Sequence, residues 1–485
     1  MKFPPRRSTD FSFLPRCEQK SQHKMKKKTT LKKALPLYRQ KPLSRKKALK
    51  IKKANKRPRL DANESAAVRE DSPLPITHHS QRTLKALDLF CGAGGFSLGF
   101  QMAGFDVIGG IERDKWACET FEFNHPGATT IHRNITEVSD DELKELFSRK
   151  KPDIIVGGPP CQGYSIANKK SGDPKDPRNS LFKEFLRIGA ALQPDIMVME
   201  NVPNLCAART ASKESVLEII KQSLKEQGYH PYSTILHATS FGVPQMRQRL
   251  FVIGSRFPLS SAFPTPTHHV IEDGDRLLFD DEFLPCPSLW DAISDMPPLE
   301  AGEGAEECPY STEPLTEYQR TLRDGSPALF NHKAMCHTKR IVERFKSMKC
   351  GDTINDVSEH LKPRKRNSSE IATVAYDQNN RRMHPERQCH TVPASFYANF
   401  VHPFQHRNFT AREGARIQSF PDWFRFLGKP TVVSHKLLAR EERDEELHLC
   451  QYNQIGNAVP PILAKAVALN IKHQLEKHQN ACSRK

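Results

Sequence analysis

The sequence predicts an α/β fold built on a doubly wound, mainly parallel sheet, followed by a second, smaller domain. Short apolar runs, such as residues 86–90 and 195–199, alternate with amphipathic stretches of helical period up to residue 255. Glycines follow the first apolar run directly, where a strand would turn sharply into a helix. After residue 255 the chain becomes proline-rich and irregular until about residue 390. Such alternation favours a parallel sheet with ligands at the carboxyl ends of its strands.

The first strand, glycine loop and helix form a candidate cofactor site. Residues 86–90 are predicted to be a strand, residues 91–95 a tight turn and residues 96–103 a helix. Such a loop brings backbone N–H groups and a helix N-terminus close to a nucleoside cofactor. The second strand, residues 107–111, ends at Glu112, where nucleotide-binding sheets place an acceptor for ribose hydroxyls. The glycine spacing is not Gly-x-Gly-x-x-Gly, so for the loop alone a purely structural turn stays open.

The same alternation continues along the chain. Predicted helices cover residues 115–124, 140–148, 180–192 and 212–227, and predicted strands lie near residues 130–135, 153–156, 195–199, 233–237 and 250–253. Toward the C-terminus, residues 410–418 are predicted to form a capped helix. An apolar helix is expected from Pro461, which suits a first helical turn, to about Ile471.

A cysteine at the exit of a strand is the main candidate for catalysis. Glycines and prolines stop the strand at residues 153–156 and hold Cys161 at its end. Glu200 ends the next strand in the same manner, and Arg247 and Arg249 lie in a turn further along. Because the carboxyl ends of parallel strands lie at one edge of a sheet, these side chains would share a site with the glycine loop. A lone cysteine in a turn, without such neighbours, is more often inert.

The basic character of the chain is confined to its N-terminal tail. Residues 1–60 hold 22 lysines and arginines against 2 acidic residues, whereas the whole chain of 485 residues carries a net charge of +18. Residues 1–80 are therefore predicted to be a basic, disordered tail, because their composition cannot bury enough apolar surface to order itself. A solubilising tail, a tether to nucleic acid and a nuclear localisation signal all stay open for this segment.

Apolar runs and cysteines argue against other classes of protein. No run approaches the length of a membrane span and the chain start lacks the apolar core of a secretory signal, so a soluble intracellular protein is expected. The 12 cysteines are scattered without a Cys-x-x-Cys pair, which gives no support to a disulfide framework. Isolated pairs such as Cys336-His337 and Cys389-His390 are not regarded as a metal site, and no metal is expected.

Six short blocks stand out along the chain. They are Asp88-Leu89-Phe90-Cys91-Gly92-Ala93-Gly94-Gly95, Gly158-Pro159-Pro160-Cys161-Gln162, Glu200-Asn201-Val202, Gln245-Met246-Arg247-Gln248-Arg249, Arg412-Glu413 through Phe420-Pro421-Asp422, and Gln454-Ile455-Gly456-Asn457-Ala458-Val459-Pro460. In their order and spacing the sequence resembles the DNA cytosine-5 methyltransferases, from about Leu84 to Asn470. The resemblance implies a Rossmann-like methyltransferase with four parts, namely the tail (1–80), a catalytic domain that binds S-adenosylmethionine (84–255), a target-recognition domain (256–395) and a C-terminal part that returns to the catalytic domain (396–475).

The resemblance implies a covalent reaction with the target base. Carbon 5 of cytosine is a poor nucleophile until a thiolate has added to carbon 6, and Cys161 is the implied nucleophile. Glu200 would hold or supply a proton at ring nitrogen 3. Arg249, with Arg247 beside it, would bind the carbonyl oxygen of the ring or a flanking phosphate and stabilise the developing charge. An ordinary surface ion pair is the alternative for each arginine.

The resemblance also identifies the cofactor as S-adenosyl-L-methionine. The implied cofactor-binding residues are Phe90, Gly92, Gly94, Glu112, Asn134, Ile135, Pro160 and Asn457. Glu112 would accept hydrogen bonds from the ribose, and Asn457 would lie close by as the last helix returns to the first strand. Asn134 stands where the family often has an aspartate that accepts from the adenine amino group, and its side-chain oxygen can still accept.

Double-stranded DNA is the expected partner. A cytosine inside a duplex hides its carbon 6, so the target base must be rotated out of the stack, and the chain after Cys161 is a candidate for closing over it. Residues 364–366, residues 379–382 and Gln388 could read base edges or phosphates, although most such exposed charges are only solvated surface. A charged segment, residues 429–451, looks like an insertion and has no role assigned by the sequence.

Two other functions stay open at this point. One is a cytosine-5 methyltransferase acting on tRNA or other RNA, but the Cys-Phe-Thr block typical of the tRNA-acting branch is missing. The other is a non-catalytic DNA-binding relative, which the presence of cysteine, glutamate and arginines disfavours. We expect a monomer without a membrane partner, in the cytoplasm at the nucleoid, or in the nucleus of a eukaryote. Its functional rather than physical partner would be a cognate restriction endonuclease, unless it is a solitary methylase.

Overall fold

The fold is known from a computed structural model, which describes residues 82–160, 181–210, 212–270, 283–365, 370–371, 379–431, 438 and 440–482. Residues 79–485 form one compact unit. Cys161 and the residues after it as far as residue 180 lie outside the described parts of the chain, as does the basic tail. Among the described helices, none is long and apolar enough to cross a membrane.

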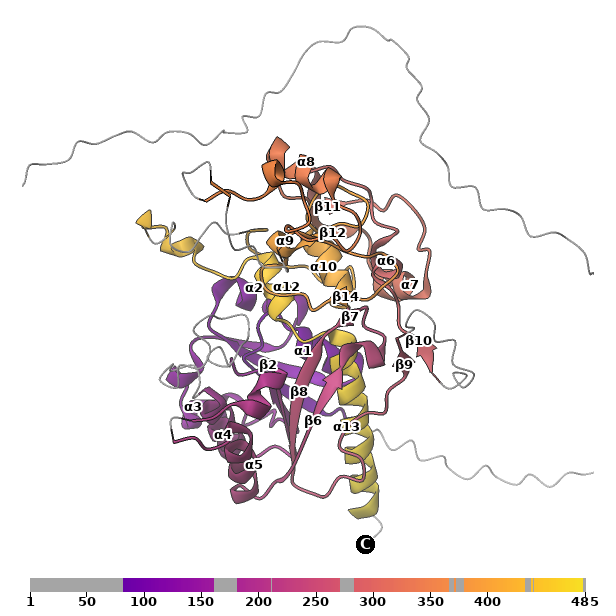
Figure 1. The fold of residues 1–485 in the computed structure, drawn as a ribbon. Coiled ribbons are helices and arrows are strands. Elements are labelled where there is room, and N and C mark those ends of the chain that lie inside the picture. Colours follow the sequence, from indigo (N-terminus) through magenta and orange to yellow (C-terminus); the bar gives the residue numbers. More distant parts are fainter. Residues whose placement is uncertain are drawn as a thin grey trace, which may run out of the picture. The chain divides into compact units, whose positions relative to one another are not determined.

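A seven-stranded sheet forms the lower half of the molecule in Figure 1. In sheet order its strands are β3 (Thr129–His132), β2 (Asp106–Glu112), β1 (Lys85–Leu89), β4 (Ile154–Gly157), β5 (Ile196–Asn201), β8 (Gln248–Ser255) and β6 (His230–His237). Pairing is parallel from β3 to β5, and β8 runs antiparallel to both β5 and β6. The predicted doubly wound, mainly parallel sheet is thus confirmed, with β8 as the one reversed strand among the seven.

Helices cover both faces of the sheet. One face packs on α3 (Asp140–Leu146), α4 (Leu181–Leu192) and α5 (Val216–Glu226), the other on α1 (Gly95–Met102) and α13 (Pro461–Cys482), which runs down one side of the sheet in Figure 1. Because side chains alternate along a strand, Leu87 and Leu89 join the first core while Ala86 joins the second. The remaining helix of this part, α2 (Lys115–Asn124), packs on β2 and β3.

Among the predicted boundaries that differ from the observed ones are those of β3, β8 and the last helix. β3 ends at His132, because Asn134 caps a short 3₁₀ helix, η1 (Ile135–Glu137). β8 begins at Gln248, so Arg249 lies on a strand and not in a turn. The last helix continues from the expected end at Ile471 to Cys482, since its polar C-terminal half still buries Leu475 and Gln474 against the rest of the protein.

Residues after 255 form short elements. Among the described residues after 255, the short helices are α6 (Leu289–Ile293), α7 (Glu317–Arg323), α8 (Lys339–Ser347), α9 (Phe396–Asn399), α10 (Ala411–Ile417) and α12 (Gln451–Asn457). The described parts of the chain after η1 also contain the 3₁₀ helices η4 (Pro203–Ala207), η5 (Ala238–Phe241), η7 (Glu359–Leu361) and η8 (Asp444–Glu446). Four two-stranded pairs join β9 (His268–His269) to β10 (Leu284–Pro285), β11 (Gly304–Cys308) to β12 (Leu329–Lys333), β13 (Arg381–Arg382) to β15 (Phe400–Val401), and β14 (Cys389–His390) to β7 (Gln245–Met246). The last pair connects this part of the chain to the strand that precedes Arg249.

Buried ion pairs surround α10. Thr410 caps this helix through a capping box with Glu413, as the sequence predicts. Glu413 also accepts from both terminal nitrogens of Arg407 at 2.8 and 2.7 Å. Arg416 pairs with Asp422 at 2.7 Å and with Asp295 at 3.0 Å. All of these charged groups are buried, so each depends on its partners to offset the loss of water.

Candidate active site

The glycine loop lies between β1 and α1 in a strained, tightly packed conformation. Phe90 and Gly94 both adopt positive φ angles, 65° and 95°. At Gly94 a side chain is excluded twice, because of this φ and because a Cβ would lie 2.4 Å from Nε2 of His125. Gly92 has open space around it, with no heavy atom of the described residues within 4 Å of its Cβ position. A ligand can therefore approach the backbone at Gly92, while Gly94 fixes the turn.

Glu112 closes the loop from the end of β2. Its Oε2 accepts from the N–H of Gly92 at 3.0 Å, and its Oε1 accepts from the N–H groups of Arg113 and Asp114, each at 2.8 Å. Burial raises the pKa of Glu112, while the N–H group of Asp114 acts in the opposite direction. The carboxylate is thus held beside the open backbone of Gly92, which fits a group that accepts from a nucleoside ribose.

The structure places three other predicted cofactor residues after β3 and at the end of α12. Asn134 uses its side-chain oxygen to accept from the N–H of Thr136 at 3.4 Å, and Ile135 is buried in the core. Asn457 is exposed at the end of α12. Two residues after it, the carbonyl of Val459 lies so close to α1 that a Cβ on Gly95 would be 2.6 Å away. The last helices therefore do return to the glycine loop.

Glu200 and Arg249 form an ion pair at the carboxyl rim of the sheet. Nε of Arg249 lies 2.7 Å from Oε1 of Glu200, and the two side chains are only 13% and 12% exposed. They meet because β8 runs antiparallel to β5, so the start of β8 lies beside the end of β5. Burial lowers the pKa of Arg249, and the carboxylate of Glu200 opposes this shift. The guanidinium therefore stays charged although the site is mostly buried.

The chain leading to the predicted nucleophile passes directly beside this pair. A Cβ on Gly158 would lie 3.1 Å from Oε2 of Glu200. Asn201, the next residue of β5, donates from Nδ2 to the carbonyl of Pro159 at 3.0 Å. Pro160 is the last described residue before the gap, and Cys161 lies outside the described residues. The two blocks that carry the predicted glutamate and cysteine are therefore joined through Asn201 and Pro159.

The structure corrects the role expected for Arg247. Its side chain is 2% exposed and donates to three backbone carbonyls, those of Val392 at 3.1 Å, Gly456 at 3.2 Å and Ala458 at 3.0 Å. A guanidinium engaged in this way cannot reach a base or a phosphate. Arg247 instead joins β7 to the chain before α9 and to the end of α12, and Arg249 is left as the arginine of the site.

Several of the predicted recognition residues have partners within the protein, among them Arg382 and Gln388. Arg382 is buried and donates to the carbonyls of His402 and Pro403 at 2.6 and 2.9 Å. The amide of Gln388 donates to the carbonyl of Cys286 at 3.1 Å. Lys365 remains at the surface, paired with Glu370 at 2.7 Å. Within the described parts of the chain, no group of three or more His, Cys, Asp or Glu side chains could hold a metal ion.

Two residues near the glycine loop were not expected to belong to the site. Asp88, on β1, is 1% exposed, its Oδ2 accepts from Ser97 at 2.6 Å, and burial raises its pKa to about 7. His125 lies 3.2 Å from the carbonyl of Gly94 through Nε2 and 3.0 Å from Gln101 through Nδ1. Asp88 could have been suspected as a carboxylate inside an apolar strand, whereas nothing local in the sequence marks His125.

The cysteines with raised pKa values are poor nucleophiles. Burial raises the pKa of the thiols of Cys91 and Cys389 well above the usual range, and that of Cys118 and Cys286 to about 12. These thiols stay protonated at neutral pH, which leaves them without thiolate character.

Sheet order, glycine loop and rim carboxylates define a protein of the Rossmann-like methyltransferase class. A solved structure described as a putative DNA modification methyltransferase encoded within an E. coli prophage has the same fold, with a TM-score of 0.61 and 24% identity over 81% of this chain and 100% of that one. The family model for C-5 cytosine-specific DNA methylase matches residues 84–473. The chain belongs to this family and is a DNA cytosine-5 methyltransferase.

Two relatives are similar over most of their length. Type II methyltransferase M.DdeI of Desulfomicrobium norvegicum is 46% identical over 396 residues, which are 81% of this chain and 89% of the relative. Type II methyltransferase M1.HphI of Haemophilus parahaemolyticus is 34% identical over 387 residues, 80% of this chain and 86% of the relative.

Proposed function

We propose that Cys161, Glu200 and Arg249 methylate carbon 5 of a cytosine that is rotated out of a specific duplex DNA sequence, with S-adenosyl-L-methionine as the methyl donor. The observation that carries this proposal is the ion pair of Glu200 with Arg249 at 2.7 Å, directly beside the Gly158 to Pro160 segment that leads to the cysteine. A carboxyl and a guanidinium held together in a mostly buried site are suited to the edge of a pyrimidine ring that carries nitrogen 3 and the carbonyl oxygen.

Each side chain has one task in the proposed reaction. The thiolate of Cys161 forms a bond to carbon 6 of cytosine, and the displaced electron density is accommodated at ring nitrogen 3 by a proton that Glu200 holds. Arg249 orients Glu200 and stabilises charge on the ring carbonyl. Carbon 5 then takes the methyl group as the bond between that group and the sulfonium sulfur breaks, which would leave the donor as a neutral thioether. Carbon 5 loses its proton to a base, the proton at nitrogen 3 returns to Glu200, and the bond between Cys161 and carbon 6 breaks to regenerate the thiolate.

The glycine loop is proposed to hold the methyl donor. When bound, S-adenosylmethionine supplies an electrophilic methyl group on a sulfonium centre. Glu112 would accept from the ribose hydroxyls, as its fixed position beside Gly92 supports. Phe90, Gly94, Asn134, Ile135, Pro160 and Asn457 remain proposed contacts around it. Asn134 would use the lone pair that Thr136 leaves on its side-chain oxygen.

The biological setting is proposed from the relatives. Both relatives described above are named Type II methyltransferases, so we propose that this chain is the modification partner of a restriction endonuclease. In this setting it acts as a monomer on double-stranded DNA in the cytoplasm, at the nucleoid. The division into catalytic (84–255), recognition (256–395) and returning C-terminal (396–475) parts belongs to the same proposal.

Transfer of label from tritiated S-adenosylmethionine tests the substrate. Duplex DNA should take up label, tRNA should not, and Cys161→Ser should abolish transfer while leaving DNA binding intact. A duplex with 5-fluorocytosine in its sites tests the covalent step, because fluorine cannot leave carbon 5 as a proton does and the thioether bond persists. A stable adduct is expected with the wild type and none with Cys161→Ser. Label entering tRNA alone would exclude the proposal.

A further inference from the structure

The charged segment without an assigned role, residues 429–451, is anchored beside the candidate cofactor site. Near its end the ring of His448 lies 5.4 Å from the indole of Trp116, measured between ring centroids. Directly before its start, Gly428 packs so tightly that a Cβ there would lie 2.7 Å from the same indole. Trp116 belongs to the first turn of α2, the helix that begins shortly after Glu112. Both ends of the segment therefore meet on one side chain.

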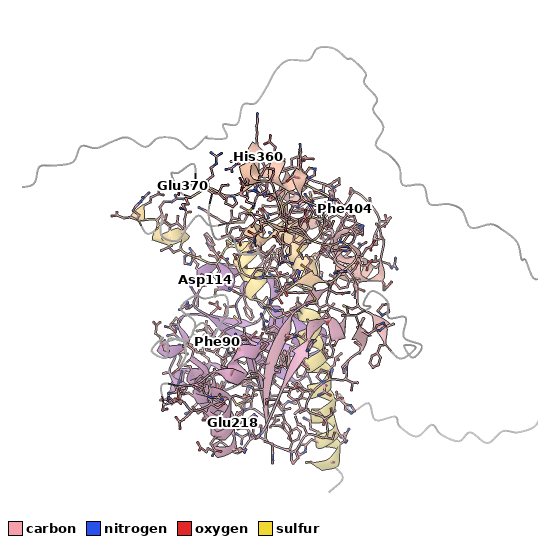
Figure 2. All side chains as sticks on the ribbon, viewed as in Figure 1. Phe90, Asp114, Glu218, His360, Glu370 and Phe404 are labelled. Carbon is pink, nitrogen blue, oxygen red and sulfur yellow. The ribbon has the colours of Figure 1, made fainter. Side chains whose placement is uncertain are left out.

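Asp114 connects the segment to Glu112. Its Oδ1 accepts from the N–H of Ala117 at 3.0 Å and caps α2, while its Oδ2 accepts from the N–H of Leu449 at 2.9 Å. Nδ1 of His448 lies 3.6 Å from the same Oδ2. The N–H of Asp114 donates in turn to Oε1 of Glu112 at 2.8 Å. A continuous set of contacts thus runs from the segment to the carboxylate proposed for the ribose, and in Figure 2 Asp114 lies where the yellow C-terminal chain meets α2.

A polar seam extends this attachment along α2. Trp116, Thr120 and Asn124 are spaced four residues apart and share one face of the helix. Thr120 accepts from the N–H of Leu427 at 2.9 Å, and Asn124 exchanges hydrogen bonds of 2.8 and 3.0 Å with the backbone of Arg425. The position of α2, and with it the turn from Glu112 to Asp114, therefore depends on the chain that flanks the segment.

The segment is closed at its base. The carbonyl of Lys429 accepts from the N–H of Gln451 at 3.0 Å, so the two strands of chain that enter and leave it are bonded to each other. Glu446 lies 2.5 Å from the ammonium of Lys429 and 2.7 Å from the guanidinium of Arg443. The backbone hydrogen bond and the two ion pairs therefore help to hold His448 and Leu449 in place against Asp114.

We propose that the ends of this segment, Gly428–Lys429 and His448–Leu449, are a positioning element for the methyl donor. They fix Asp114 and Trp116, which fix the turn that carries Glu112, so the segment sets the affinity for S-adenosylmethionine without touching the reacting atoms. This inference rests on the proposed function, in which Glu112 binds the ribose. Without the contact the turn is free before binding and must be ordered by the ligand, which weakens binding by about 3- to 10-fold.

Calorimetric titration of the full chain with S-adenosylmethionine tests the inference. His448→Ala removes the contact to Trp116 and the approach to Asp114, and should raise Kd about 3- to 10-fold. His448→Phe keeps a ring against Trp116 and should recover part of the loss. Arg440→Ala, an exposed change in the same segment, is the matched control and should bind as the wild type does. In kinetics, His448→Ala should raise KM for the donor and leave kcat at saturating donor within about twofold.

The outcomes separate this inference from the function beneath it. A wild type that binds the donor, together with a His448→Ala variant of equal Kd, would overturn the inference and leave the proposed function standing. A wild type that binds no donor would overturn both. Lower kcat or weaker DNA binding with an unchanged donor Kd would mean that the segment acts on DNA, against the inference. If His448→Ala does not fold, Trp116→Phe should show the same rise in KM for the donor. An unchanged KM in that variant would equally overturn the inference.

Discussion

Arg247 and Arg249 belong to one sequence block and yet have opposite surroundings. Arg247 is enclosed by carbonyls from residues far along the chain, whereas Arg249 faces Glu200 at the sheet rim. Nothing within the block distinguishes them, because both are long cations next to a strand. Only the partners brought in by the fold, Val392 and the end of α12, decide which arginine is available to a substrate.

Replacement of Arg249 should cost activity and not stability. Arg249→Met removes the charge that orients Glu200, so we expect kcat/KM for methyl transfer to fall by about 10²- to 10³-fold. Arg249→Lys should recover little of this, since an ammonium cannot reproduce the directed Nε contact. Rates of transfer to DNA and thermal unfolding measure the two effects. A variant with the wild-type rate would remove Arg249 from the proposed site.

Replacement of Arg247 should have the reverse effect and serves as the matched comparison. Arg247→Met removes the guanidinium from the carbonyls of Val392, Gly456 and Ala458, and we expect a loss of about 3 kcal/mol or more in the free energy of unfolding. Urea denaturation measures this loss. An unchanged urea midpoint would mean that water replaces the guanidinium and that the side chain is not structural.

At the scale of elements, α1 and α13 pack without room for one more methyl group. A Cβ on Gly99 would lie 2.3 Å from Cβ of Ala464 and 2.7 Å from the backbone of Pro461 and Lys465. Because backbone atoms cannot turn aside, Gly99→Ala should destabilise the fold by about 1–3 kcal/mol. Leu469→Ala, at a 47% exposed position of α13, is the control and should have little effect on the urea midpoint. Equal midpoints for both variants would contradict the close packing.

The sequence predicts the elements of the sheet well and its polar contacts poorly. Strands such as β5 and helices such as α2 follow from apolar runs and period, because both are local properties. The end of α13 is missed because its second half is amphipathic and polar, and its packing partner, Ser260, lies far away in sequence. The seam of Trp116, Thr120 and Asn124 carries no apolar signal. Long-range hydrogen bonds of this kind have no periodicity and cannot be read without the fold.

For the whole molecule, the second part of the chain shares its core with the glycine loop. Ala93 and Leu98, from the glycine loop and α1, pack in one cluster with Phe396, Phe420 and Ile455. The buried charges around α10 lie in the same region. The sequence marks Arg416 and Asp422 as members of a block, but their third partner, Asp295, comes from an irregular stretch that offers no pattern. For the division into domains, the boundaries drawn from composition remain a proposal.

Acid should destabilise the whole molecule through its buried histidines. Burial lowers the pKa of His125 to about 4 and that of His402 to about 3, and His332 and His337 are shifted in the same direction. Since the unfolded chain has histidine pKa values of about 6.5, it binds more protons than the folded chain below that pH. The contribution of these histidines to the free energy of unfolding is therefore fully present above pH 6.5. It is lost as the pH falls toward their pKa values in the folded protein, by up to about 1.4 kcal/mol per pH unit for each histidine.

Asp88 acts in the opposite direction and makes this prediction specific. Burial raises its pKa to about 7, above the usual 3.8, so its contribution to stability is present at low pH and is lost as pH rises through 7. Between pH 6.5 and 5, Asp88 releases a proton when the protein unfolds. This release offsets one of the protons that the histidines take up on unfolding. Asp88→Asn removes this offset, so the variant should take up about one more proton on unfolding than the wild type does. Its urea midpoint should therefore fall more steeply from pH 7 to pH 5. His125→Gln should flatten the same dependence. Parallel curves for Asp88→Asn and wild type would mean that Asp88 is ionised in the folded protein, with a cation or water at the Oδ1 that has no hydrogen-bond partner within the described part of the chain.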